Sequence, residues 1–129
     1  MRYYRKKISS KIIFENNKTI AFLSNKNDVS GHILIVPKIH FSNLDDINEE
    51  EFFEVQKTLL KINNHVVKNC QYTGTNILMA SGKSAGQSIN HIHFHLIPRK
   101  ENDNINAWPR LSDKKEGTSE ELYKKLKIN

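Results

Sequence analysis

The sequence of 129 residues predicts one compact domain built from short strands and one long helix. Two β-prone runs separated by a turn open the domain, a segment with helical periodicity occupies its centre, and a run that alternates histidine with apolar residues follows. We expect a single domain over residues 1–129, with a core over about residues 11–99 and a polar tail over 100–129.

The first part of the core predicts three strands. Residues 11–15 and 19–23 are β-prone and flank Asn16-Asn17-Lys18, which has the composition of a hairpin turn. Residues 32–36 form an apolar run rich in β-branched side chains, which is typical of a central strand, and Pro37 ends it.

A long helix is predicted next, because apolar side chains recur at spacings of three and four residues. Asn48 is a favourable N-cap residue, and Glu51 stands three positions later, as in a capping box. Such a stripe is typical of core packing rather than of a cofactor site. Its members are Phe52, Val55, Leu59, Ile62 and Val66.

The second part of the core predicts two more strands, at residues 75–80 and 89–97, joined by a loop of small residues at 81–86. We expect Pro98 to stop the last strand.

The tail is predicted to be irregular over residues 100–116, around Trp108. Thr118 and Glu121 then have the spacing of a capping pair, which predicts a short helix ending at Leu126.

The most informative run contains His91, His93 and His95 in strict alternation. In a strand, alternate side chains share a face, so these imidazoles would lie in a row with neighbours roughly 6.6 Å apart. The intervening side chains are large and apolar and would face the core. Three histidines in this pattern indicate a chemical site rather than isolated structural histidines.

Metal binding is the first chemistry that such a row allows, since neutral imidazole is a common ligand for zinc, copper and iron. His32 or His40 could complete a site in the folded chain, but zinc usually takes a carboxylate, thiolate or further histidine as well. No acidic residue lies between Glu54 and Glu101. We therefore expect no metal and no other cofactor.

Nucleophilic catalysis by imidazole, for which a phosphorus atom is a suitable electrophile, is the second and favoured chemistry, because a neutral imidazole attacks without first losing a proton. Gly86-Gln87-Ser88 lies immediately upstream and offers backbone N–H groups, an amide and a hydroxyl to the phosphate oxygens. Gly82-Lys83-Ser84 resembles the end of a P-loop, but Ile77 stands where that motif needs glycine. We therefore interpret Lys83 as a solvated lysine of the loop.

Two motifs, residues 31–40 (GHILIVPKIH) and residues 85–99 (AGQSINHIHFHLIPR), closely resemble the histidine-triad (HIT) family. The resemblance covers about residues 12–99. It implies an α+β fold in which a five-stranded antiparallel sheet carries one long helix, and in which two subunits form a homodimer with a ten-stranded sheet.

The resemblance also implies roles for individual residues. His93 would be the nucleophile, His95 would contact the α-phosphate, and His91 and His40 would orient groups and relay protons. Gln87 and Ser88, beside Gly86, would hold phosphate oxygens or the leaving group.

The implied activity is hydrolysis at the α-phosphate of a purine nucleotide or dinucleotide, because a third-position histidine, here His95, is associated with hydrolases in this family. Nucleotides of the phosphoramidate type are the favoured substrates, and dinucleoside polyphosphates are the alternative. A nucleotide-binding interaction module with incidental turnover is a further alternative from another class.

The sequence departs from the family pattern at the expected ribose contact. Ser24 stands where relatives often carry an acidic or amide residue, and Asn25 would replace it only with a shift of one position. Ala80 and Ser81 occupy a stretch where many relatives have an asparagine. We expect contacts that discriminate between substrates near Trp108 and across the dimer interface.

Composition adds general expectations about the partners of the chain. The net charge of +6 favours phosphates, but much of it lies at the termini, including residues 2–7, so no nucleic-acid binding is expected. The single cysteine, Cys70, is compatible with a reducing compartment. Without a long apolar run, we expect no membrane span and a cytoplasmic location.

Overall fold

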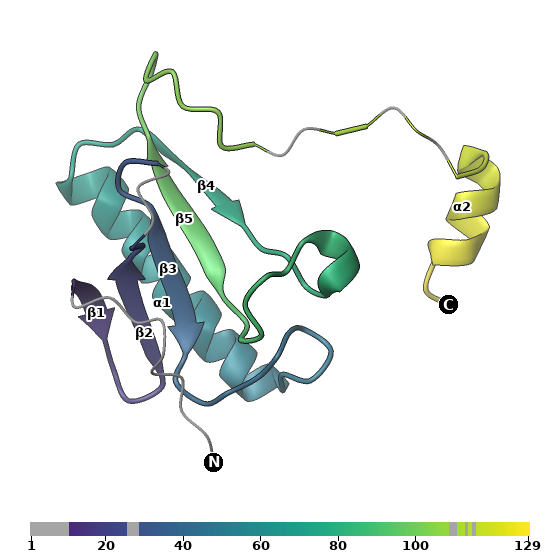
Figure 1. Cartoon of the computed structure of the whole chain (residues 1–129), viewed down its shortest axis with the longest axis horizontal. Coiled ribbons are helices and arrows are strands. Elements are labelled where there is room, and N and C mark those ends of the chain that lie inside the picture. Colours follow the sequence, from purple (N-terminus) through teal and green to yellow (C-terminus); the bar gives the residue numbers. More distant parts are fainter. Residues whose placement is uncertain (1–10, 26–28, 109–110, 113, 115) are drawn as a thin grey trace.

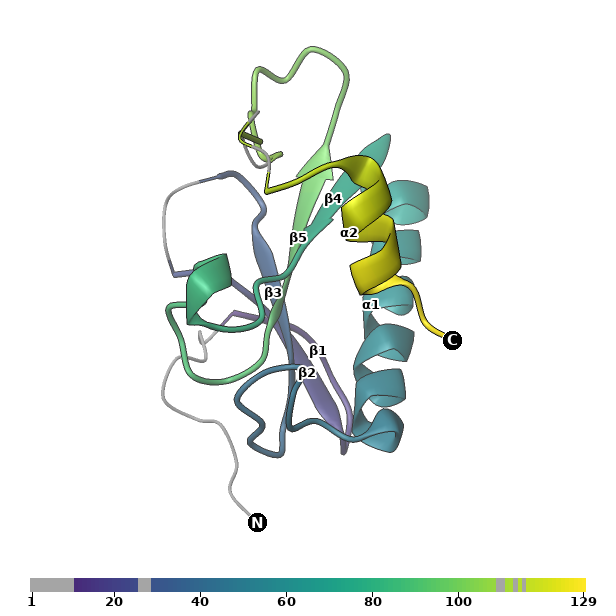
Figure 2. The ribbon, with the colours of Figure 1, turned by 90° about the vertical axis from the view of Figure 1, so that its right-hand side faces the viewer.

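The computed structural model describes residues 11–25, 29–108, 111–112, 114 and 116–129. A five-stranded antiparallel sheet in the order β1-β2-β3-β5-β4 carries the helix α1 on one face (Figures 1 and 2). The strands are β1 Ile12–Glu15, β2 Thr19–Leu23, β3 Ile33–Pro37, β4 Gly74–Leu78 and β5 Phe94–Arg99. The α+β fold and the predicted hairpin are confirmed.

Helix α1, Glu49–Asn69, begins as the capping pattern predicts. The side chain of Asn48 accepts a hydrogen bond from the N–H of Glu51 at 2.9 Å, which satisfies one of the donors left open at a helix start. The buried face of α1 presents apolar side chains to the sheet. The resulting core contains Ala21, Ile33, Ile35, Val55, Ile62, Val66, Ile92, Phe94 and Leu96.

The opposite face of the sheet carries the other set of side chains, because neighbours along a strand alternate between faces. Leu34 of β3 pairs with His95 of β5, and both follow residues that belong to the α1-facing core. His95 therefore projects from the face that α1 does not cover. The 3-10 turn η1, Lys83–Ala85, also lies on that side of the sheet (Figure 2).

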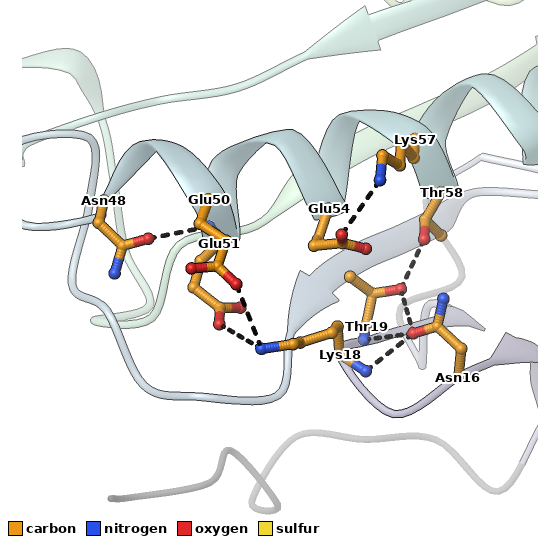
Figure 3. Close-up of polar contacts among 9 residues, drawn as sticks. All are labelled: Asn16, Lys18, Thr19, Asn48, Glu50, Glu51, Glu54, Lys57 and Thr58. Carbon is orange, nitrogen blue, oxygen red and sulfur yellow. Dashed lines mark hydrogen bonds and ion pairs between the residues drawn. The ribbon is translucent and has the colours of Figure 1, made fainter.

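A polar cluster fastens the β1–β2 turn to α1 (Figure 3). The side-chain oxygen of Asn16 accepts hydrogen bonds from the backbone N–H groups of Lys18 and Thr19, and the hydroxyls of Thr19 and Thr58 are hydrogen-bonded. Lys18 Nζ also lies 3.1 Å from a carboxylate oxygen of Glu51. These contacts fix the position of α1 over the strands.

The last strand differs from its predicted bounds at both ends. It was expected over residues 89–97, but β5 begins at Phe94 and continues through Pro98 to Arg99. Pro98 pairs with Thr75 of β4, and β3 has already started at Ile33, opposite Leu96, so Pro98 has a ladder partner on one side only. The expected stop at Pro98 was wrong, because a strand tolerates proline at a position where no neighbouring strand would accept a hydrogen bond from the missing N–H.

The tail begins with a turn held by Arg99. Its guanidinium lies within 3.0 Å of both carboxylate oxygens of Asp103 and donates to the carbonyl of Ile105 at 2.6 Å. The same guanidinium holds the pKa of Asp103 well below its ordinary value. The predicted short helix is confirmed as α2, Ser119–Leu126, and it stands apart from the sheet in Figure 1.

The side chain of Thr118 caps α2 by accepting from the N–H of Glu121. Among the residues that the structure describes, no helix combines the length and apolar character needed to cross a bilayer. Residues 2–7, expected to be a solvated basic segment, lie outside the described residues.

Candidate active site

A cavity of about 120 Å³ lies on the sheet face opposite α1, between the adjoining strands and the loop around η1. It brings together parts of the chain that are more than 60 residues apart. Its lining consists of Ser24, His32, Leu34, Ala80, Gly86, Gln87, Ser88, Ile89, His93 and His95.

His93, the predicted nucleophile, has a defined tautomer. Its Nδ1 lies 2.8 Å from the carbonyl oxygen of His91. A carbonyl can only accept, so Nδ1 of His93 carries the proton and Nε2 keeps the lone pair. The half-buried ring lines the cavity, and Nε2 is therefore the nitrogen that has a lone pair for a nucleophilic role.

His95 is held by a histidine whose role the sequence did not reveal. Nε2 of His32 and Nδ1 of His95 lie 2.7 Å apart, with the ring centroids separated by 5.0 Å. When His32 donates, His95 carries its own proton on Nε2, as a donor to a phosphate oxygen would. The ring of His95 also meets the edge of His93, at 4.9 Å between centroids. His32 thus positions the second imidazole of the cavity.

His91 lies outside the strand in which the prediction placed it, and its ring is buried instead of lining the cavity. It precedes β5, is 1% exposed, and does not line the cavity. Its Nε2 donates to the carbonyl of Pro37 at 3.0 Å. This side-chain hydrogen bond takes the place of the backbone hydrogen bond that a longer β5 would have made to Pro37. Pro37 offers no N–H of its own, and the paired part of β3 and β5 ends at Ile35–Phe94.

His91 and His40 form a second histidine pair behind the nucleophile. Because Nε2 of His91 is the donor to Pro37, its Nδ1 accepts from Nδ1–H of His40 across 3.0 Å. Burial, with a smaller contribution from the nearby rings of His40 and His93, lowers the pKa of His91 to about 4. His91 is therefore neutral at pH 7 and acts on His93 through its backbone carbonyl.

The loop after β4 contributes Gly86, Gln87 and Ser88, the residues expected to hold phosphate, to the cavity. Gly86 has a φ of 93°, which glycine adopts without strain. The amide of Gln87 accepts from the N–H of Gly82 at 2.8 Å and donates to the carbonyls of Ser42 and Ile89 at 2.6 and 2.9 Å. Both N–H groups of this amide thus hold the loop, so Gln87 shapes the cavity wall and has no amide N–H left to donate to a bound group.

The structure separates the two candidates for the ribose contact. Ser24 lines the cavity together with Ala80, whereas Asn25 is exposed and does not. Trp108, expected near the substrate, is 62% exposed and does not line the cavity.

Metal binding was expected to be absent. Within the described part of the chain, no three histidine, cysteine, aspartate or glutamate side chains come together in a group that could hold a metal ion. The expectation that catalysis needs no metal stays a prediction, which a chelator can test.

Comparison with known proteins identifies the family. A model described as the HIT domain matches residues 5–102. Adenosine 5′-monophosphoramidase of Saccharomyces cerevisiae is 33% identical over 107 residues, which cover 81% of this chain and 65% of the yeast protein. Bis(5′-adenosyl)-triphosphatase of Dictyostelium discoideum is 32% identical over 94 residues, which cover 73% of this chain and 63% of that protein. The chain therefore spans a little under two thirds of each of these enzymes.

The solved structure of a HIT family protein from Bacillus anthracis matches with a TM-score of 0.73 and 32% identity, over 91% of this chain and 83% of that one. The match of the family model to most of the chain, together with one histidine pair at the cavity and a second pair behind His93, agrees with the resemblance found in the sequence. This chain belongs to the histidine-triad (HIT) family.

Proposed function

We propose that the chain is a nucleotide hydrolase that removes the substituent on the α-phosphate of a purine nucleoside monophosphate. The observation that carries the proposal is the hydrogen bond from Nδ1 of His93 to the carbonyl of His91, because it leaves a lone pair on Nε2 at a cavity. A protein that only binds nucleotides has no need of such a nucleophile.

The reaction proceeds in two displacements. The lone pair on Nε2 of His93 forms a bond to the α-phosphorus, and the bond from phosphorus to the substituent breaks, with its electron pair leaving on the substituent. Water then attacks the phosphorus and releases Nε2, giving the nucleoside monophosphate and a proton. His95 and Ser88 line the same cavity and supply donors for the phosphate oxygens in both steps.

The favoured substrates are phosphoramidate-type nucleotides, and a yeast relative is named adenosine 5′-monophosphoramidase. Dinucleoside polyphosphates are the alternative, since the relative from Dictyostelium is named bis(5′-adenosyl)-triphosphatase. The alternative that is not an enzyme is a nucleotide-binding module with incidental turnover. This alternative would be favoured if His93→Ala abolished hydrolysis without changing the function of the protein in the cell.

The first test measures AMP release by the wild-type protein from adenosine 5′-phosphoramidate and from diadenosine triphosphate, each with and without a chelator. We expect release from the phosphoramidate at the higher kcat/KM and no effect of the chelator, because imidazole attack needs no metal. Loss of activity with the chelator would contradict the mechanism. Faster turnover of the dinucleotide would favour the alternative substrate class.

We also propose that the chain forms a homodimer through α1 and β4. Phe53, Leu60 and Val67 recur every seven residues on α1 and are 55%, 60% and 37% exposed. β4 is an edge strand of the sheet, with Ile77 exposed on it. Exposed apolar side chains along one face of a helix, in a fold that also has an open strand edge, are typical of a surface that another subunit covers. Two β4 edges pairing would give the ten-stranded sheet.

The prediction for this dimer is that Leu60→Glu converts it to a monomer, because the interface would bury an unpaired carboxylate. Light scattering should give twice the chain mass of 15.0 kDa for the wild type and a single chain mass for the variant. Leu126→Glu, which changes an exposed leucine of α2, is the control. A monomeric wild type at working concentration would disprove the proposal.

A further inference from the structure

A second cavity, of about 270 Å³, adjoins the first and has no part in the mechanism described so far. The two share a wall formed by Gln87, Ser88 and Ile89. The remaining lining residues of the second cavity are Asn43, Gly82, Lys83 and Asn90.

The lining of the second cavity suits an anion. Lys83 is its one charged residue, and the lining contains no acidic side chain. In the described part of the chain, Lys83 makes no ion pair with a carboxylate. The nearby carboxylate of Asp46 is engaged by the backbone N–H groups of Ser42 and Asn43, at 3.0 Å each. The ammonium of Lys83 is therefore available to an incoming anion.

The position of the cavity relative to His93 indicates which part of a substrate it would receive. In an in-line displacement the leaving group departs from the side of the phosphorus opposite the nucleophile. His93 and His95 line only the first cavity, whereas Ser88 lines both. A phosphorus atom bound at the shared wall would thus have its nucleophile in the first cavity and its leaving group in the second.

We propose that the second cavity is a leaving-group site for substrates whose leaving group is an anionic phosphate chain, and that Lys83 determines this specificity. The inference rests on the proposed hydrolase function and deepens it. When Nε2 of His93 bonds to the α-phosphorus, the bond from phosphorus to the bridging oxygen breaks and that oxygen keeps the electron pair. The leaving nucleoside phosphate gains one negative charge, which the ammonium of Lys83 stabilises.

A phosphoramidate does not place the same demand on Lys83. Breaking the bond from phosphorus to nitrogen releases an amine, which takes up a proton and leaves without added negative charge. The ratio of kcat/KM for diadenosine triphosphate to kcat/KM for adenosine 5′-phosphoramidate therefore reports on Lys83, while each separate rate also reports on His93.

The test measures this ratio for wild type, Lys83→Gln, Lys83→Arg and the control Lys124→Gln. We expect Lys83→Gln to lower the ratio about tenfold, since a charge-assisted contact to the leaving group is lost. Lys83→Arg keeps the charge and should hold the ratio within about twofold of wild type. Lys124→Gln removes the same charge from exposed α2 and should leave the ratio unchanged.

A ratio unchanged in Lys83→Gln, or both substrates slowed equally, would overturn the inference, because Lys83 would then have no role or only a role in shaping the loop. Addition of salt should reduce the difference between wild type and Lys83→Gln, since Lys83 is exposed. Failure of the hydrolase proposal would look different: the wild type would release AMP from neither substrate.

Discussion

His93→Ala is expected to lower the rate of nucleoside monophosphate release by about four orders of magnitude or more. The substitution removes the atom that forms the covalent bond to phosphorus, and the carbonyl of His91 that orients His93 cannot substitute for it. The groups that hold the phosphate would remain, so substrate binding should change much less than turnover. Single-turnover kinetics and equilibrium binding of AMP would measure the two effects separately.

The matched control is His65→Ala, because His65 is an exposed histidine of α1, on the face of the sheet away from the cavity. Its activity should equal that of the wild type, and both variants should unfold at the same urea concentration as the wild type. If His93→Ala kept more than about a tenth of the wild-type rate, water would be attacking the phosphorus directly and the nucleotidyl-histidine route would be wrong.

The elements that the sequence predicted well depend on local signals. Asn48 and Thr118 cap their helices through bonds to residues three positions later, and both caps were recognisable from spacing alone. The hairpin at residues 16–18 is likewise set by its own turn composition. The predicted boundaries of the strand that carries the histidines were less accurate, since the ends of a strand depend on which residues of the neighbouring strands pair with it.

His91 and His32 show how much of the site depends on contacts distant in sequence. The three histidines alternate with apolar residues in the sequence, but the side chain of His91 is buried and hydrogen-bonds to the carbonyl of Pro37, 54 residues earlier. His32 joins the cavity because the register pairs Leu34 with His95, which no local pattern discloses. A histidine at the start of a buried strand was the only available signal.

Gln87 lines the cavity, but its hydrogen-bond partners differ from those that the sequence suggested. An amide next to a proposed phosphate site suggested a direct donor, yet its three hydrogen bonds go to Gly82, Ser42 and Ile89. The residue type indicates hydrogen-bonding capacity, whereas the fold determines which groups use it.

The second large effect is a loss of stability in acid caused by His91. The pKa of its buried ring is about 4 in the folded chain, against 6.5 for an ordinary histidine. Between these values the unfolded chain binds a proton that the folded chain does not, so the free energy of unfolding falls as pH falls. The contribution is fully present above about pH 7 and is lost progressively toward pH 4, by about 3 kcal/mol in all.

Urea unfolding at pH 7.5, 6, 5 and 4, at one protein concentration, measures this loss. In His91→Gln the amide can still donate to the carbonyl of Pro37 but does not titrate, so the variant should lose about 3 kcal/mol less than the wild type between pH 7.5 and 4. The lowered pKa values of Asp46 and Asp103 affect stability mainly at lower pH, because the unfolded chain protonates these carboxyls only as the pH approaches their ordinary pKa of 3.8. Both carboxyls are present in the wild type and in the variant. His65→Gln controls for the change of residue type. Parallel pH profiles for the wild type and His91→Gln would mean that His91 takes up its proton at the same pH in the folded and the unfolded chain, which would contradict the lowered pKa of the buried ring.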